Sequence, residues 1–205
     1  KIEDMIYHTK IVASSVNYSF LISDMPFMSF YNANVALDNA KRLMQDGGAQ
    51  MVKLEGNRSQ INIIEKLALS DIPICAHIGL RPQSVNKMGG YKVQGKSSNE
   101  ANALIQEAKK IEDSGADLLL LECVSSQTAK ELASEISIPI IGIGAGLEVD
   151  GQILVLYDIL GISQGQLPKF SKNYMNGNNT IEDAIKQYIQ EVKTLKYPTD
   201  KHSFK

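Results

Sequence analysis

The chain has little of several features that mark particular classes of protein. Its 205 residues include no tryptophan and only two cysteines, Cys75 and Cys123, which stand alone without the Cys-x-x-Cys spacing of a metal or redox site. No apolar run approaches the roughly 18 residues of a membrane helix, and the N-terminal residues lack the apolar stretch of a signal peptide. These absences predict a cytoplasmic protein without a membrane span, whose cysteines are small buried hydrophobic residues.

The chain also lacks an excess of charge of either sign. It carries 21 lysines and arginines against 23 aspartates and glutamates, a formal net charge of -2. A nucleic-acid or anionic membrane partner would require a basic surface, so we exclude both classes of partner. With 43% hydrophobic residues, the chain can bury the core of one sizeable domain.

Short apolar runs alternate with segments of helical periodicity along the whole chain. The runs of strand length lie at residues 19–24, 49–55, 72–79, 116–123, 138–146 and 152–161. Apolar residues recur at helical spacing in residues 32–48, 58–70, 97–115, 126–137 and 180–195. Such alternation predicts a parallel α/β sheet, which is compatible with an open doubly wound sheet or with a (β/α)8 barrel.

Polar residues at the ends of the predicted strands favour the barrel. They are Asp24 on the first strand, Lys53 and Glu55 on the second, His77 on the third and Glu122 on the fourth. The carboxyl ends of barrel strands converge on one mouth, where sites are built. Each carboxylate taken alone is about as compatible with a structural role, as a helix cap or in a rim salt bridge, as with a functional one. A lone histidine is more often structural than catalytic.

The segment "MVKLE", residues 51 to 55, shows how one strand can serve both the core and a site. Side chains alternate between the two faces of a strand, so Lys53 and Glu55 share one face while Val52 and Leu54 share the other. We expect the charged pair to face the barrel mouth and the apolar pair to pack against the helices.

Several segments together resemble the ketopantoate hydroxymethyltransferase family. They are "DMPFMSF" (24–30), "MVKLEG" (51–56), "HIGLRPQSVNKMGGYKVQGK" (77–96), "LLLECV" (119–124), "IPIIGIGAG" (138–146), "DGQILVLYDILGI" (150–162), "PKFSKNY" (168–174) and "YPTDKHSF" (197–204). The resemblance implies a (β/α)8 TIM barrel that transfers a hydroxymethyl group from 5,10-methylenetetrahydrofolate to 3-methyl-2-oxobutanoate in pantothenate biosynthesis. It also implies a homo-oligomer, a decamer.

The resemblance assigns roles to the strand-end residues. Asp24 and Glu55 match carboxylates of a Mg²⁺ site, Asp24, Lys53 and His77 match residues near the substrate, and Glu122 matches the proposed proton acceptor. These residue types suit enolate chemistry, because a hard cation and an ammonium group stabilise charge on the enolate oxygen while a carboxylate accepts the proton.

One feature of the family is absent from this sequence. The family carries a Gly-Asp-Ser motif on an earlier strand, where the aspartate is a further metal ligand and the serine helps to hold the substrate, and these three residues do not occur in succession here. Six strand candidates also fall short of the eight in a barrel. We therefore expect a single barrel domain over residues 1–205, incomplete at its N-terminus, with the first two β/α units outside the chain and the cavity open on that side.

Two other functions and two undecided segments stay open at this point. The alternatives are a Mg²⁺-dependent carbon–carbon lyase or mutase of the isocitrate lyase and phosphoenolpyruvate mutase group, and a non-catalytic barrel. The glycines of residues 141–146 either bring backbone amides to an anion or allow close packing. Residues 86–96 form either a surface loop or a flap over the substrates.

Overall fold

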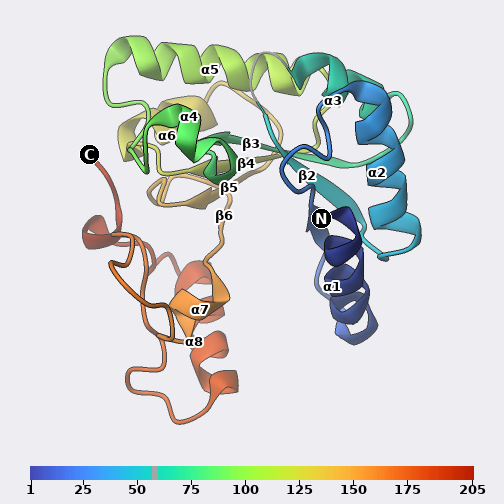
Figure 1. Cartoon of the computed structure of the whole chain (residues 1–205). Helices are drawn as coiled ribbons and strands as arrows, with labels where there is room; N and C mark the ends of the chain where they lie inside the picture. Colours follow the sequence, from blue (N-terminus) through green and yellow to red (C-terminus); the bar gives the residue numbers. More distant parts are fainter. Residues whose placement is uncertain (57–59) are drawn as a thin grey trace.

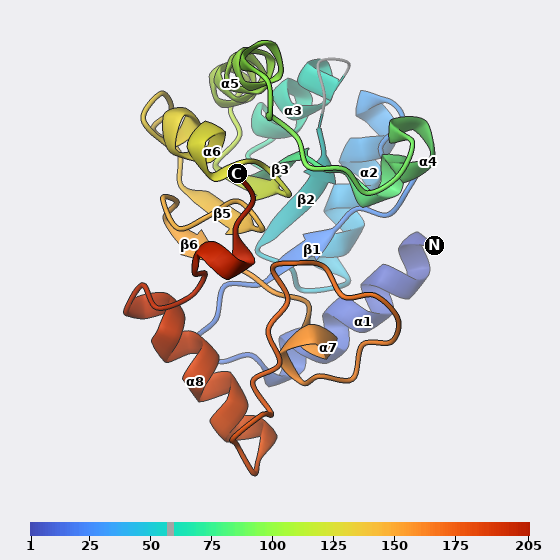
Figure 2. The same cartoon turned by 90° about the vertical axis from the view of Figure 1, so that its left-hand side faces the viewer.

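The computed structural model describes residues 1–56 and 60–205, and its centre is one sheet of six parallel strands. The strands are β1 (Ile22–Asp24), β2 (Met51–Glu55), β3 (Ile74–Gly79), β4 (Leu118–Glu122), β5 (Ile140–Ile143) and β6 (Gly151–Gln152). They pair in chain order and curl into a half-barrel with β1 and β6 at its edges (Figure 2). The predicted α/β barrel architecture is confirmed for this part of a TIM barrel.

Helices separate the first five strands and cover the sheet. They are α1 (Ile2–Ser15), α2 (Ala33–Gln45), α3 (Ile61–Ala68), α4 (Val85–Met88), α5 (Ser98–Asp113), α6 (Ser126–Ala133), α7 (Leu156–Ile159) and α8 (Ile181–Lys193), with short 3-10 turns η2 (Pro82–Ser84) and η3 (Asp200–His202). Figures 1 and 2 show α2, α3, α5 and α6 on the convex side of the sheet. Within the described ranges, no helix combines the length and apolar character that crossing a bilayer would need.

Local side-chain hydrogen bonds explain where the main helices begin. Helix α5 starts with a reciprocal capping box, in which the Ser97 hydroxyl accepts from the Glu100 amide and the Glu100 carboxylate accepts from the Ser97 amide. The side chain of Asn32 caps α2 by accepting from the amide of Val35 at 3.0 Å. These signals are local in sequence, so the helices were predictable from it.

The two faces of the sheet bury different sets of side chains. Val52 and Leu54 are fully buried in the core between the sheet and its outer helices, as the alternation in β2 predicted. Met51, Cys75 and Leu120 belong to a second cluster on the concave side. Burial raises the pKa of Cys75 to about 12, so this thiol behaves as a hydrophobic side chain, and Cys123 is likewise free and buried.

The prediction of a strand over residues 152–161 is wrong for most of its length. Strand β6 ends at Gln152, and the chain then turns into the single-turn helix α7, in which the amide of Ile159 donates to the carbonyl of Val155 at 3.1 Å. The buried carboxylate of Asp158 accepts hydrogen bonds from Ser163 and Ser171. A short apolar run does not distinguish a strand from a helix, and these contacts with later residues accompany the helical turn.

The glycine-rich segment 141–146 serves close packing. Gly144 has a φ of +65°, and a Cβ atom there would lie 2.4 Å from the ring of Phe170. The absence of a side chain therefore allows Phe170 to approach the end of β5 and to join the concave cluster. Of the two interpretations of these glycines, this is the one that the packing supports.

Candidate active site

The carboxyl ends of β1 to β4 bring all five predicted site residues to the concave side of the sheet. In the parallel register, Asp24 lies opposite Lys53 and Glu55 lies opposite His77. Glu122 ends the next strand, and it shares the face of Leu120 because it lies two residues further along. Residues spread over about a hundred positions of sequence thus become neighbours because each lies in the carboxyl-terminal half of a strand, and parallel strands end on the same side of the sheet.

Four of these side chains form a continuous row of polar contacts. The Lys53 ammonium lies 2.8 Å from Oδ1 of Asp24 and 3.3 Å from Nδ1 of His77. On the other side of the ring, Nε2 of His77 lies 3.3 Å from a carboxylate oxygen of Glu122. The His77–Glu122 end of the row is shielded from solvent, with side chains 2% and 15% exposed, whereas the Asp24 side chain at the other end is 41% exposed.

The contact with Lys53 determines the tautomer of His77. An ammonium group only donates hydrogen bonds, so Nδ1 accepts and the proton of the neutral ring lies on Nε2. The short contact between Nε2 and Glu122 is not aligned as a hydrogen bond, and Nε2 has no other partner in the part of the chain that the structure describes. This buried N–H can therefore donate to a bound substrate.

Glu55 is the most deeply buried carboxylate at the site. Glu55 is 4% exposed, and both of its carboxylate oxygens accept a hydrogen bond from the backbone amide of Gln83, at 3.1 and 3.0 Å. Burial raises the pKa of Glu55, and the charge of Asp24 adds to that effect, whereas the Gln83 amide, His77 and Lys53 oppose it. A cation between the two carboxylates would offset the cost of keeping both of them ionised.

The residues present fit a hard cation that keeps much of its own water. Oδ1 of Asp24 is buried, and apart from the Lys53 ion pair it has no hydrogen-bond donor among the described residues. No group of three or more histidine, cysteine, aspartate or glutamate side chains with metal-binding geometry occurs in residues 1–56 and 60–205. Mg²⁺ commonly binds through one or two carboxylates and completes its octahedral shell with water and substrate oxygens. Asp24 and Glu55 would supply the protein's share of that shell.

Sequence reasoning missed the residue that connects the site to its surrounding loops. Besides holding Glu55 through its backbone, Gln83 donates from its side-chain amide to the carbonyl of Met25 at 2.9 Å. It thereby ties the loop after β1 to the turn after β3. Gln83 is part of the quoted segment 77–96, but no local pattern shows that it contacts residues 28 and 58 positions away.

The loop that was predicted as a surface loop or flap is anchored at its C-terminal end. The amide of Gln94 donates to the carbonyl of Cys123, and the carbonyl of Gln94 accepts from the amide of Ser125. The hydroxyl of Thr128 donates to the carbonyl of Gly95 at 2.7 Å. These bonds attach the end of the loop to the segment that follows Glu122.

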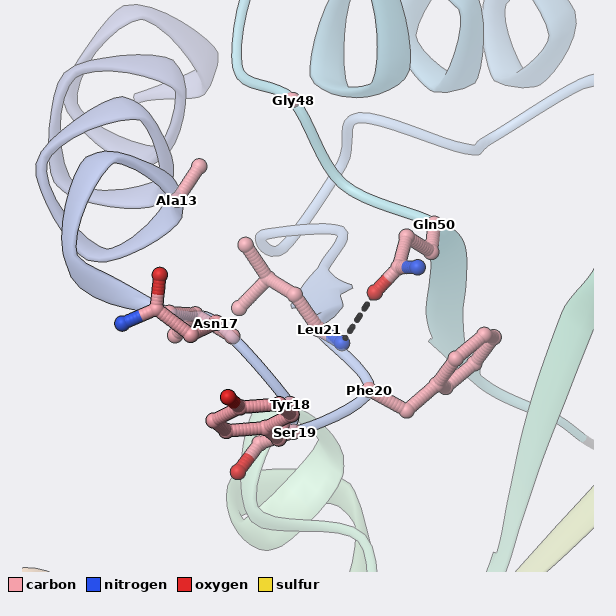
Figure 3. Close-up of a pocket in the computed structure, with 9 residues that line it drawn as sticks. Ala13, Asn17, Tyr18, Ser19, Phe20, Leu21, Gly48 and Gln50 are labelled. Atoms are coloured by element: carbon pink, nitrogen blue, oxygen red, sulfur yellow. Dashed lines mark hydrogen bonds between the residues drawn. The ribbon is translucent and has the colours of Figure 1, made fainter.

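A cavity of about 380 Å³ lies away from the row of polar residues (Figure 3). It is lined by the end of α1 and by the residues that precede β1 and β2, among them Tyr18, Leu21 and Gln50. The Leu21 amide donates to the side-chain oxygen of Gln50 there at 3.0 Å. The cavity lies at the amino ends of these strands and contains none of the predicted site residues.

Comparison with known proteins identifies the family. The family model described as ketopantoate hydroxymethyltransferase matches residues 1–200. The chain is 50% identical over 204 residues to the 3-methyl-2-oxobutanoate hydroxymethyltransferase of Buchnera aphidicola subsp. Acyrthosiphon pisum (strain APS), a match that covers 100% of this chain and 77% of the relative. It is 49% identical over 203 residues to the protein of that name from Alkalilimnicola ehrlichii, with 99% of this chain and 73% of the relative covered. The chain belongs to the ketopantoate hydroxymethyltransferase family.

Proposed function

We propose that this protein transfers a hydroxymethyl group from 5,10-methylenetetrahydrofolate to 3-methyl-2-oxobutanoate, giving 2-dehydropantoate for pantothenate biosynthesis. The proposal depends on one observation in a chain of this family. Asp24, Lys53, His77 and Glu122 form a row of polar contacts across the carboxyl ends of four neighbouring strands. The row combines a carboxylate that can accept a proton with donors that can stabilise an oxyanion, which are the groups that enolate formation requires.

The first chemical step is removal of the proton from C3 of the keto acid. Glu122 accepts this proton as a carboxylate, the electron pair of the C–H bond forms the C2–C3 double bond of the enolate, and the π electron pair of the carbonyl group moves to the keto oxygen. The Lys53 ammonium and the Nε2–H of His77 stabilise the resulting negative charge. Asp24 and Glu55 would hold Mg²⁺, which would supply further positive charge for stabilising the enolate.

The second step forms the new carbon–carbon bond. The nucleophilic C3 forms its new bond to the methylene carbon of the folate donor, and both carbon–nitrogen bonds of that carbon break. Water supplies the oxygen of the new hydroxyl group, and the two nitrogens receive the proton taken from C3 and one proton of the water. The overall reaction consumes one water and releases tetrahydrofolate. The His77–Glu122 end of the row is shielded from solvent, so the enolate is less exposed to reprotonation by water before it attacks the folate donor.

A transfer assay on the purified protein tests the proposal. We expect 2-dehydropantoate to form only when the keto acid, methylenetetrahydrofolate and Mg²⁺ are all present, and we expect a chelator of divalent cations to abolish its formation reversibly. Cleavage or rearrangement of a 2-oxo acid without folate would favour the lyase or mutase alternative. The absence of any turnover by the full-length gene product would favour the non-catalytic barrel.

We also propose a homo-oligomer, with a decamer as the expected form, and a cytoplasmic location. The free state of both cysteines agrees with a reducing compartment. Light scattering by the purified protein would measure the number of subunits.

A further inference from the structure

A second, smaller cavity borders the candidate active site. It has a volume of about 100 Å³ and lies at the carboxyl ends of β1 to β3, between the loop after β1 and the starts of α3 and η2. Phe27, Tyr31, Glu55, Gln60 and Gln83 are among the residues that line it. Because Glu55 also lies beside the polar row, a molecule in this cavity would be next to a keto acid bound at Lys53 and His77.

Two of the lining residues have buried oxygen atoms without a hydrogen-bond donor. Oε1 of Gln60 and Oε1 of Gln83 are both buried, and neither finds a partner in the described part of the chain. The orientation of the Gln83 amide follows from the structure, because its nitrogen donates to the carbonyl of Met25 and its oxygen is therefore the free end. Buried acceptors without partners are rare and costly, so this pair indicates a ligand that donates hydrogen bonds.

Aromatic side chains form another part of the cavity wall. Phe27 is 69% exposed and Tyr31 is 62% exposed, although both are large and partly apolar. Aromatic rings offer their faces to other flat rings, and covering them removes apolar surface from water. The combination of exposed rings and unpaired acceptors suits a flat heterocycle that carries N–H groups.

We propose that this cavity binds the pterin ring of the one-carbon donor, with Gln60 and Gln83 accepting hydrogen bonds from its amino and ring N–H groups and with Phe27 and Tyr31 covering it. The inference rests on the proposed function, which requires a folate donor beside the keto acid. It adds a subsite and two specificity-determining residues. Because Glu55 lines this cavity, a pterin ring bound in it would place the one-carbon unit at the same end of the half-barrel as C3 of the keto acid.

Binding measurements on matched variants test the proposal. Gln60→Met and Gln83→Met remove the acceptors with little change in side-chain length. Gln83→Met also removes the donor to the Met25 carbonyl, so Gln60→Met is the cleaner of the two. Gln190→Met makes the same change on the exposed face of α8. Calorimetric titration of tetrahydrofolate should show affinity lowered about 10-fold by each of the first two changes, since each leaves a ligand N–H without its acceptor. Gln190→Met should bind tetrahydrofolate like the original protein. Titration of 3-methyl-2-oxobutanoate on the same samples shows whether a variant has lost the neighbouring site as well.

The possible results separate this inference from the proposed function. An original protein that binds tetrahydrofolate, with weaker binding only in the two cavity variants, supports the subsite. If both cavity variants bind tetrahydrofolate as tightly as the original protein does, water satisfies these acceptors and the subsite is overturned while the proposed function stands. If the original protein binds no tetrahydrofolate at all, both the subsite and the folate-dependent function fail.

Discussion

The Lys53 ammonium lies 3.3 Å from Nδ1 of His77, and this contact decides which nitrogen of the ring carries the proton. Because the ammonium can only donate, the N–H of the neutral ring is on Nε2, the nitrogen on the side of Glu122. The histidine that the family resemblance assigned to the neighbourhood of the substrate is thus held in the tautomer that can donate to a substrate oxygen.

Replacing His77 tests whether this N–H acts on the substrate. His77→Asn keeps a short polar side chain near Lys53 but removes Nε2, so we expect the affinity for the keto acid and the turnover number to fall about 10-fold or more. Steady-state kinetics with varied keto acid would measure the two effects separately. His8→Asn, on the exposed side of α1, is the control and should leave both constants unchanged. Unaltered kinetics in the His77 variant would remove Nε2 from the mechanism.

Glu122→Gln should keep the fold and lose most of the proton abstraction. General-base catalysis contributes on the order of 10²- to 10⁴-fold, and an amide cannot take the proton. Isotope exchange at C3 of 3-methyl-2-oxobutanoate, measured without folate, follows this step alone. Glu148→Gln, at a carboxylate whose side chain is 59% exposed, is the matched control. Exchange at the original rate in the Glu122 variant would exclude this residue as the base.

Gly79→Ala should destabilise the edge that holds Glu122. Gly79 has a φ of +87°, and a Cβ atom there would lie 2.3 Å from the carbonyl oxygen of Glu122. Gly165 has a similar φ of +83° but nothing within 4 Å of its Cβ position, so Gly165→Ala isolates the backbone effect. Urea denaturation should show the Gly79 variant less stable than the Gly165 variant by about 1–3 kcal/mol. Equal stabilities would show that the two strands can separate at this point without cost.

The Glu191 carboxylate should make the stability of the C-terminal region depend on pH. Burial tends to raise its pKa, but hydrogen bonds from Lys172 at 2.5 Å, Gln187 at 2.9 Å and Tyr174 at 3.0 Å outweigh burial and lower it below the ordinary value of 4.5. A carboxyl group with a lowered pKa stabilises the folded state above its unfolded-state pKa, and that contribution is lost as pH falls through the folded-state value.

Glu191→Gln is therefore expected to lower the free energy of unfolding by about 1–3 kcal/mol near pH 7. Below pH 4.5, this difference between the variant and the original protein should shrink as the pH falls further. Urea denaturation from pH 7 to pH 3 would measure this difference. A difference that stayed constant over the whole range would mean that the charge of Glu191 contributes nothing. Glu182→Gln, at an exposed carboxylate of the same helix, should show little effect at any pH.

The sequence by itself determined the elements and the residue types at the site. The alternation of short apolar runs with helical periodicity predicted the parallel sheet, because both signals depend on residues only a few positions apart. The structure adds that Ser97 and Asn32 cap two helix starts through hydrogen bonds to residues only three positions away, which are equally local contacts. The polar ends of four strands could be read as one site once the strands were taken as parallel, since parallel strands end at a common edge.

Only the tertiary structure decided which atoms of these residues meet. Three contacts of the site join residues 24 to 43 positions apart. They are the Lys53–His77 contact that sets the tautomer, the hydrogen bond from the Gln83 amide to Glu55, and the close approach of Gly79 to Glu122. The apolar run after Gln152 became a helical turn in which Asp158 is held by serines further along the chain. Such contacts depend on where the strands bring distant backbone segments together, and no local pattern of side chains contains that information.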